Sequence, residues 1–211
     1  MAITVKQTNY QVAADHGFEA ARWQTAETLA DLGAKVGPDD VCRLPVLNAV
    51  FEIDFTERTV TFIQSGPEGT IEGAVGKRWE ILALHYLCAR MPAGGPAGLA
   101  SFADFPDARG YQSVYEGRVV RRLCATAGRN LESFIAAAER IGGRVAPFGD
   151  VGYQFDVFPK APVIVPWYAG DEDFPPNVSF VYPSNIFQLL PAEDVVVLSE
   201  CLVSRLQGKG W

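Results

Sequence analysis

Two histidines are the only imidazoles in this 211-residue chain, and His85 is the one with the clearer chemical potential. It lies in an apolar segment with Cys88 three residues later, so a helix would place both side chains on roughly one face. Together they could hold a metal, or the imidazole alone could be an axial ligand of a haem or corrinoid. The alternative is a core histidine whose ring nitrogens bond to a carbonyl or carboxylate. His16, beside Asp15, is expected in solvent.

A run of three carboxylates is the second candidate: Asp171, Glu172 and Asp173. It could attract a cation or an amine, although its spacing does not match a calcium loop. Aromatic side chains flank it, as they do in many ligand pockets and also in many cores: Trp167, Tyr168 and Phe174. The alternative interpretation is a solvated turn at a sheet edge that opposes aggregation.

Other catalytic and binding signatures are weak. The chain has no Gly-x-Ser-x-Gly motif, and its one Gly-Gly-Pro stretch lacks the Lys-Ser/Thr of a phosphate loop. Its four widely spaced cysteines fit no zinc or iron–sulfur pattern, so reduced thiols and no metal centre are expected. A small basic cluster is expected to be a solvated helix face that could also bind a carboxylate or propionate: Arg118, Arg121 and Arg122.

Composition narrows the class of protein. The chain has 25 acidic and 18 basic residues, a net charge of −7, so it offers no general surface for nucleic acid. Hydrophobic residues make up 48% of the chain, enough for a core and too many for a disordered chain. No apolar run has the length of a membrane span, and the first residues lack the pattern of a signal peptide. We therefore expect a cytoplasmic protein that binds neither nucleic acid nor membrane.

The elements that would position these residues begin with a predicted helix over residues 12–32, ended by Gly33. Alternating residues 49–55, followed by Val60 and Phe62, predict a half-buried hairpin. An almost wholly apolar segment, residues 75–90, predicts a central helix that carries His85. Residues 91–98 are rich in glycine and proline and predict a loop.

The second half of the chain contains both helical and extended patterns. It predicts a short extended segment at residues 99–102, two helices at residues 112–125 and 131–141, and a last helix starting near Pro191. Asn130 is the expected N-cap of the second of these helices. Extended segments are predicted near residues 153–157, 163–165 and 178–182, with the flanking prolines at sheet edges or strand ends. The order of elements predicts a single α+β domain over residues 1–211, its core about residues 12–206, with an antiparallel or mixed sheet of about five to seven strands and four to five helices.

Six short sequence segments occur in a characteristic order along the chain: WEILALHYL (79–87), LASFADF (99–105), FGD (148–150), PVIVPW (162–167), GDEDFP (170–175) and LPAED (190–194). In this order they resemble an uncharacterised bacterial and archaeal domain family, catalogued as a domain of unknown function, over about residues 12–206. The resemblance implies an occurrence mainly in anaerobes and, in some members, a linked cysteine-rich iron–sulfur segment, whose cysteines this chain lacks.

The chain departs from that family at two places. Leu99-Ala100 stand where an aromatic residue is expected, and Tyr182-Pro183 where an acidic one is. The resemblance implies no established reaction. The anaerobic setting suggests tetrapyrrole or corrinoid chemistry only by association.

Three functions remain open at this level. The leading hypothesis is a non-enzymatic module that binds a small ligand or cofactor, with a tetrapyrrole or corrinoid as candidates, through His85, Trp79, Tyr86, Trp167, Tyr168, Asp171, Asp173 and Phe174. The second is an enzyme that uses the three carboxylates with His85. The third is a partner-binding or assembly module, a homo-oligomer included, whose acidic turn and Trp211 contact another chain.

Overall fold

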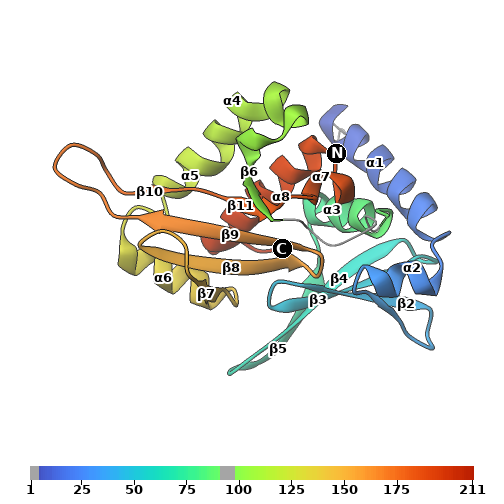
Figure 1. Ribbon diagram of the computed structural model, residues 1–211. Coiled ribbons are helices and arrows are strands. Elements are labelled where there is room, and N and C mark those ends of the chain that lie inside the picture. The colour runs from blue at the N-terminus through green and yellow to red at the C-terminus, as the bar shows by residue number, and fades with distance from the viewer. Residues whose placement is uncertain (1–4, 91–97) are drawn as a thin grey trace. The chain divides into compact units, whose positions relative to one another are not determined.

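The first half of the chain folds around a five-stranded antiparallel sheet. The computed structural model describes residues 5–90 and 98–211, and contacts divide the chain into one unit of residues 1–91 with Trp211 and a second of residues 92–210. In the first unit the strands follow one another in the order β1-β2-β3-β4-β5 (Figure 1). Their bounds are Lys35–Val36, Val41–Val46, Ala49–Asp54, Thr59–Gly66 and Gly69–Ala74. The predicted hairpin is β3 and β4, with Phe51 and Ile53 fully buried.

The helix predicted over residues 12–32 is in fact two helices, α1 (Val5–Ala21) and α2 (Ala26–Asp31). Thr25 separates them, because its extended backbone begins α2 and its side chain accepts a hydrogen bond from the Thr28 amide at 3.1 Å. The spacing of the apolar residues did not indicate this break, because both helices bury residues at intervals of three and four. Gly33, at φ 84°, ends α2 as predicted.

Helix α3 (Lys77–Leu87) is the central helix that the sequence predicted. It packs against α1, where a Cβ on Gly17 would lie 2.9 Å from the Leu84 Cβ. Most of its apolar side chains are buried: Trp79, Leu82, Ala83, Leu84, Tyr86 and Leu87. The close approach of the two helices therefore depends on a residue without a side chain at position 17.

Trp211 completes the aromatic core of the first unit. Its ring lies 5.2 Å from that of Phe51 and 5.3 Å from that of Trp79, both edge-on. Its indole nitrogen donates to Gln64 Oε1 at 3.2 Å, and its carbonyl oxygen accepts from the Gly76 amide at 3.3 Å. Edge-on aromatic pairs of this kind stabilise a core beyond their burial.

The second unit is built on another antiparallel sheet, in the order β6-β11-β9-β8-β7, with β10 also paired to β9 (Figure 1). Its strands are Leu99–Ser101, Val181–Pro183, Ala161–Tyr168, Val151–Phe158, Arg144–Ala146 and, for β10, Asn177–Val178. The predicted α+β class is confirmed. The strands are divided between two antiparallel sheets, whereas the sequence suggested one.

The prolines of β9 correct one prediction, because β9 is the central strand and not an edge. Ile164 faces Val181 of β11 and Trp167 faces Val178 of β10, so Pro166 falls between these two short strands. The Pro166 carbonyl accepts from the Ser179 amide at 3.0 Å. The N–H and C=O of one strand residue point to the same side of the strand. The N–H that Pro166 lacks would therefore face the gap between β10 and β11.

The helices of the second unit follow the predicted positions closely. The segment predicted over residues 112–125 is one helical run of α4, a π-helical turn η3, and α5: Gln112–Tyr115, Glu116–Val120 and Arg121–Cys124. The others are the short helices η1 (Phe102–Asp104), η2 (Pro106–Tyr111) and α7 (Ile186–Leu189), with the longer α6 (Leu131–Arg140) and α8 (Ala192–Leu206). Asn130 is the N-cap of α6 as predicted, whereas Pro191 is the N-cap of α8 and not its first residue.

A buried chain of hydroxyl groups joins the sheet to α8. The Ser199 hydroxyl donates to the Val195 carbonyl at 2.8 Å, so it accepts from Tyr182 at 2.7 Å, and Tyr182 in turn accepts from Tyr115 at 2.9 Å. Burial raises the pKa of Tyr182 above its ordinary value, so this phenol stays protonated and remains a donor.

Replacing Tyr182 with phenylalanine is therefore expected to destabilise the protein by about 1–3 kcal/mol, because the buried Tyr115 hydroxyl loses its acceptor. Urea unfolding followed by circular dichroism measures the change. Tyr168→Phe is the matched control, since this ring is 42% exposed and its loss of a hydroxyl should be nearly neutral. Equal effects of the two substitutions would contradict the hydroxyl chain.

Two sequence predictions concern other parts of the chain. The loop predicted at residues 91–98 lies outside the described residues except for its last position. In the described ranges, every helix is too short or too polar to cross a membrane.

Candidate functional site

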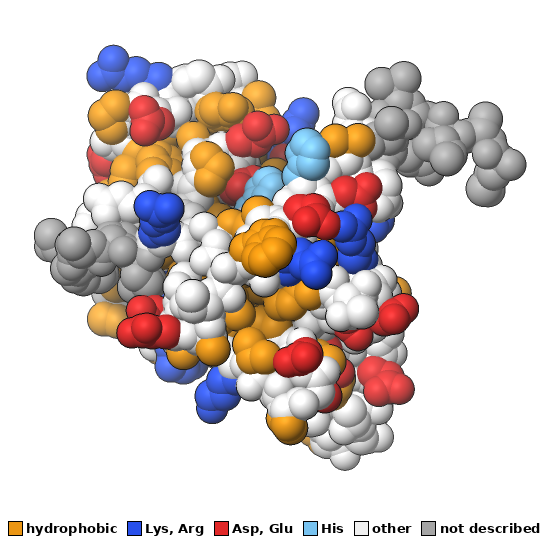
Figure 2. Space-filling view, turned by 90° about the vertical axis from the view of Figure 1, so that its right-hand side faces the viewer, with side chains coloured by type: hydrophobic (Ala, Val, Ile, Leu, Met, Phe, Trp, Pro, Cys, Tyr) orange, Lys and Arg blue, Asp and Glu red, His pale blue; other side chains and the backbone are white. Residues whose placement is uncertain are grey.

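The predicted ligand residues of the first unit are mostly structural there. Trp79 is 3% exposed within the aromatic core, and the fully buried Tyr86 donates its hydroxyl to the Leu32 carbonyl at 2.6 Å. His85 is half-buried on α3, and the pale-blue histidine side chains are visible on the face shown in Figure 2. Cys88 directs its thiol toward the Gly17 carbonyl of α1, at 3.9 Å. A cofactor role for His85 stays a prediction.

Trp167 of the second unit is buried and fixes the loop that contains Gly128. Its indole nitrogen donates to the Gly128 carbonyl at 2.9 Å, and a Cβ on Gly128 would lie 3.0 Å from both Leu123 O and Val178 Cγ1. Gly128 is therefore needed for close approach, and Trp167 fixes the chain just before Arg129. Tyr168, the next residue, is exposed at the end of β9.

The acidic turn is an exposed loop that stabilises itself. The Asp171 carboxylate accepts hydrogen bonds from the amides of Asp173 and Phe174 at 2.9 and 2.8 Å, an Asx-type turn. The loop joins β9 to β10 and projects beyond the end of the sheet (Figure 1). It lines a hollow of about 380 Å³ by itself, and Glu172 is exposed while Phe174 is 71% exposed. Ligand binding by this loop also stays a prediction.

These eight predicted residues fall into two separate groups. Trp79, His85 and Tyr86 belong to the first unit, and the other five belong to the second. The structure brings together Asp171, Asp173 and Phe174 within the acidic loop. In the part of the chain that the structure describes, no three His, Cys, Asp or Glu side chains form a group suited to a metal ion.

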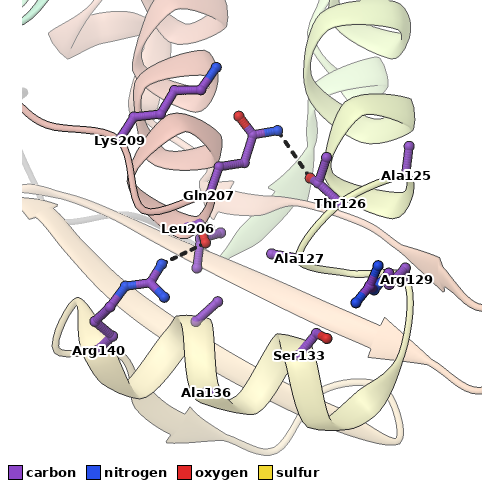
Figure 3. A pocket seen from close by; sticks show the side chains of 11 residues that line it. Ala125, Thr126, Ala127, Arg129, Ser133, Ala136, Arg140, Leu206, Gln207 and Lys209 are labelled. Carbon is purple, nitrogen blue, oxygen red and sulfur yellow. Dashed lines mark hydrogen bonds between the residues drawn. The ribbon is translucent and has the colours of Figure 1, made fainter.

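The second unit also contains a groove lined by basic side chains, and this groove is the strongest candidate for a binding site. It is an open cavity of about 720 Å³ between the end of α5, helix α6 and the end of α8 (Figure 3). We call it the basic groove, and it is lined by Ala125, Thr126, Ala127, Arg129, Ser133, Ala136, Ala137, Arg140, Leu206, Gln207 and Lys209. Arg129 lies at one end, while Arg140 and Lys209 lie at the other (Figure 3).

Helix α6 forms the floor of the basic groove. Asn130 begins this helix by accepting a hydrogen bond from the Ser133 amide at 2.8 Å, which places Arg129 just outside the first turn. Ser133, Ala136 and Ala137 follow at intervals of three and four residues and share one face. The small side chains of that face leave the groove open. The amino-terminal end of α6 also carries the partial positive charge of the helix dipole.

The opposite wall is the end of α8, and a Schellman motif shapes it. Gly208, at φ 79°, donates its amide to Arg205 O at 2.9 Å, and Lys209 donates its amide to Ser204 O at 3.0 Å. Arg140 from α6 completes this cap by donating to Leu206 O at 2.7 Å. The motif therefore turns the chain so that Lys209 lies at the rim of the basic groove.

A hydrogen-bonded network fixes the neutral polar side chains of the wall. Arg122 of α5 donates to the Gln207 side-chain oxygen at 2.6 Å and to Ser204 Oγ at 2.9 Å. The Gln207 amide nitrogen donates to Thr126 Oγ1 at 3.0 Å, and Thr126 Oγ1 donates to Arg122 O at 2.7 Å. Arg122, expected on a solvated face, thus ties α5 to α8. Arg118 of η3 likewise contacts α8, through its ion pair with Glu200 at 3.4 Å. These hydrogen bonds fix the side chains of the wall.

The residues that line the basic groove carry positive charge and no negative charge. None of its 11 lining residues is acidic, although the whole chain carries seven more acidic than basic residues. Within the described ranges, the side chains of Arg129, Lys209 and Ser133 make no hydrogen bond or ion pair with the rest of the protein. Burial first, and then the positive charge of Arg140, lower the pKa of Arg205. Positive charge therefore accumulates at the end of the groove where Arg140 lies.

Sequence reasoning missed every residue of the basic groove. The N-cap at Asn130 was recognised, and it could have indicated that Arg129 directly precedes α6 while Ser133 and Arg140, seven residues apart, lie close to one face of it. Gln207 and Lys209 had no local signal, because only the packing of α8 brings them to α6. Charged residues at helix ends are usual features of a solvated helix, so their types alone did not indicate a site.

Comparison with known proteins adds a family and nothing more specific. The family model described as "Domain of unknown function (DUF3786)" matches residues 24–205. No curated protein and no solved structure matches the chain. The predicted resemblance to an uncharacterised domain family is confirmed, while its occurrence in anaerobes and its link to iron–sulfur segments stay predictions.

Proposed function

The chain belongs to this family of unknown function, and we propose that it is a binding module whose basic groove takes a small anionic ligand. This keeps the small-ligand module expected from the sequence and changes both the site and the ligand chemistry. The proposal assigns binding to residues of the second unit alone. It requires no catalytic group, in keeping with the non-enzymatic hypothesis.

The observation that carries the proposal is a cavity lined by three cationic side chains and no carboxylate, in a chain of net charge −7. In an acidic protein, basic residues tend to be near acidic ones, as Arg144 is to Asp156 at 2.7 Å. Arg129 and Lys209 lack such a neighbour within the described residues. Guanidinium and ammonium groups that have no acidic partner are suited to carboxylate or phosphate oxygens.

The groups in the basic groove have complementary roles in this proposal. Arg129 can donate two parallel hydrogen bonds to one anionic group, and the Ser133 hydroxyl, from the first turn of α6, can add a third. The helix dipole of α6 favours the same negative charge. Lys209 supplies a mobile point charge at the other end. The Thr126 and Gln207 side chains hold the wall and have donors and acceptors already used within the protein.

Titration of the full chain with inorganic phosphate at low ionic strength tests the proposal. We expect binding observed by calorimetry, with chemical-shift changes in the amide signals of Ser133 and its neighbours. The double variant Arg129→Gln/Lys209→Gln should weaken binding by about tenfold or more, which corresponds to about 1.4 kcal/mol. Both side chains are exposed, so the variant should fold normally.

Arg109→Gln is the matched control. Arg109 is an exposed cation of the same unit that does not line the basic groove, so this variant lowers the net charge without touching the site. Its affinity for phosphate should remain within about twofold of the unmodified chain. If Arg109→Gln weakened binding as much as the double variant Arg129→Gln/Lys209→Gln, the attraction would belong to general surface charge and the proposal would fail.

A further inference from the structure

The two ends of the basic groove differ from its middle, and from this we infer that its ligand is an elongated dianion with a mainly apolar spacer. The inference rests on the proposed function, because it assumes that the groove binds an anion. It adds the chemical class: two anionic groups, one at the Arg129 end and one at the Lys209 end. A compact anion such as phosphate would occupy only one of these positions.

The length of the ligand follows from the geometry of α6. Ser133 lies in the first turn of the helix and Arg140 is its last residue, about two turns further on. At 1.5 Å per residue this interval is about 10 Å along the axis. Figure 3 shows the same separation of ends, with Arg129 beyond Ser133 on one side and Arg140 with Lys209 on the other. One small anion cannot contact both ends.

The middle of the groove defines the spacer. Between the cationic ends the groove is lined by the methyl groups of Ala127 and Ala136, with the buried side chains of Ala137 and Leu206 beneath them. The polar side chains of the upper wall, Thr126 and Gln207, bond to each other at 3.0 Å and so present few unused donors. An apolar chain can cover this surface without leaving a buried polar group unsatisfied, whereas a highly polar spacer would lose hydrogen bonds to water.

The two ends are also chemically unequal. Arg129 with Ser133 provides directed hydrogen bonds near the beginning of a helix, which suit a planar carboxylate or a phosphate. At the other end Arg140 donates to the α8 carbonyls of Leu206 and Arg205, at 2.7 and 3.2 Å, and contributes mainly its positive charge beside Lys209. The second anionic group is therefore held more loosely than the first.

Calorimetry with three carboxylates tests the inference on the full chain: decanedioate, a long dianion; octanoate, a monoanion with a similar apolar chain; and butanedioate, a dianion too short to reach both ends. We expect decanedioate to bind at least about tenfold more tightly than either of the others. In Arg129→Gln the advantage of decanedioate over octanoate should disappear, because only the end with Arg140 and Lys209 stays cationic. In Lys209→Gln the advantage should fall by at least about threefold, because Arg140 is then the one cation of that end. Arg109→Gln should preserve it.

The outcomes separate the two proposals. If decanedioate binds no more tightly than octanoate or butanedioate, while phosphate still binds and the double variant Arg129→Gln/Lys209→Gln still weakens it, the inference is overturned and the proposed function stands. If neither phosphate nor any of the carboxylates binds, both are overturned. A preference for decanedioate that survives both substitutions would place its site elsewhere on the protein and would also overturn the inference.

Discussion

Gly152→Ala is expected to destabilise the protein by about 3 kcal/mol or to prevent the second sheet from forming. Gly152 lies in β8, opposite Ala146 of β7 and Pro166 of β9. A Cβ at this position would lie 2.5 Å from the carbonyl oxygen of Phe148 and 2.8 Å from that of Ala146. Both obstacles are backbone atoms of a tight turn, so no side-chain rotation can relieve the overlap.

Gly110→Ala is the control for this prediction. No atom lies within 4 Å of the Cβ that would be added at Gly110, in the same unit. This substitution should change stability by less than about 0.5 kcal/mol. Thermal unfolding of both variants by circular dichroism, with hydrogen exchange in β7, β8 and β9, would compare them. A Gly152→Ala protein as stable as the control would show that the turn after β7 is not packed as described.

Trp211→Ala is expected to cost about 2–3 kcal/mol in the stability of the first unit, toward the lower end of the range for aromatic truncations because the residue is only half-buried. The substitution removes edge-on contacts to Phe51 and Trp79 and the indole hydrogen bond to Gln64. Hydrogen exchange should become faster in β3, β4 and α3. Exchange within the β8–β9 pair should change much less, because these strands belong to the second unit.

Trp23→Ala provides the comparison, since it removes the same side chain from a surface position. Trp23 is 77% exposed, and the Arg22 guanidinium carbon lies 5.5 Å from its ring centroid. We expect a change of less than about 1 kcal/mol, because an exposed cation–π pair contributes little. If Trp211→Ala left exchange in β3 and α3 unchanged, the aromatic core would not depend on Trp211.

Much of the fold was predictable because its signals are local. Asn130 before an apolar stripe indicated the start of α6, and Gly33 and Gly142 adopt the positive φ values that end α2 and α6. The alternation of Phe51 and Ile53 with acidic residues indicated a half-buried strand. Each signal arises from a few consecutive residues whose backbone hydrogen bonds are completed nearby. One local signal that was overlooked is Thr25, a side-chain cap within an apparently continuous helical pattern.

The basic groove was less predictable because residue types drew attention to other positions. Trp167 and Asp171 have the side chains of a binding site, yet one bonds to the Gly128 carbonyl and the other to two amides of its own loop. Arg129 and Lys209 are the kind of residue found on any solvated helix end. What distinguishes Arg129 and Lys209 is that no carboxylate lines the groove around them. A linear sequence does not show which charges surround a residue in the folded protein.

The sequence by itself determined the α+β class, most helix and strand positions and the membership in an uncharacterised family, since these depend on patterns within short segments or on their order. Only the tertiary structure decided that the strands form two sheets, that Trp211 packs into the first unit, and that Arg129, Arg140 and Lys209 share one groove free of carboxylates. Those features arise from contacts between residues far apart in the sequence, such as Phe51 and Trp211, which are 160 positions apart. Such contacts form through packing and closure of the chain, which leave no periodic trace in the sequence.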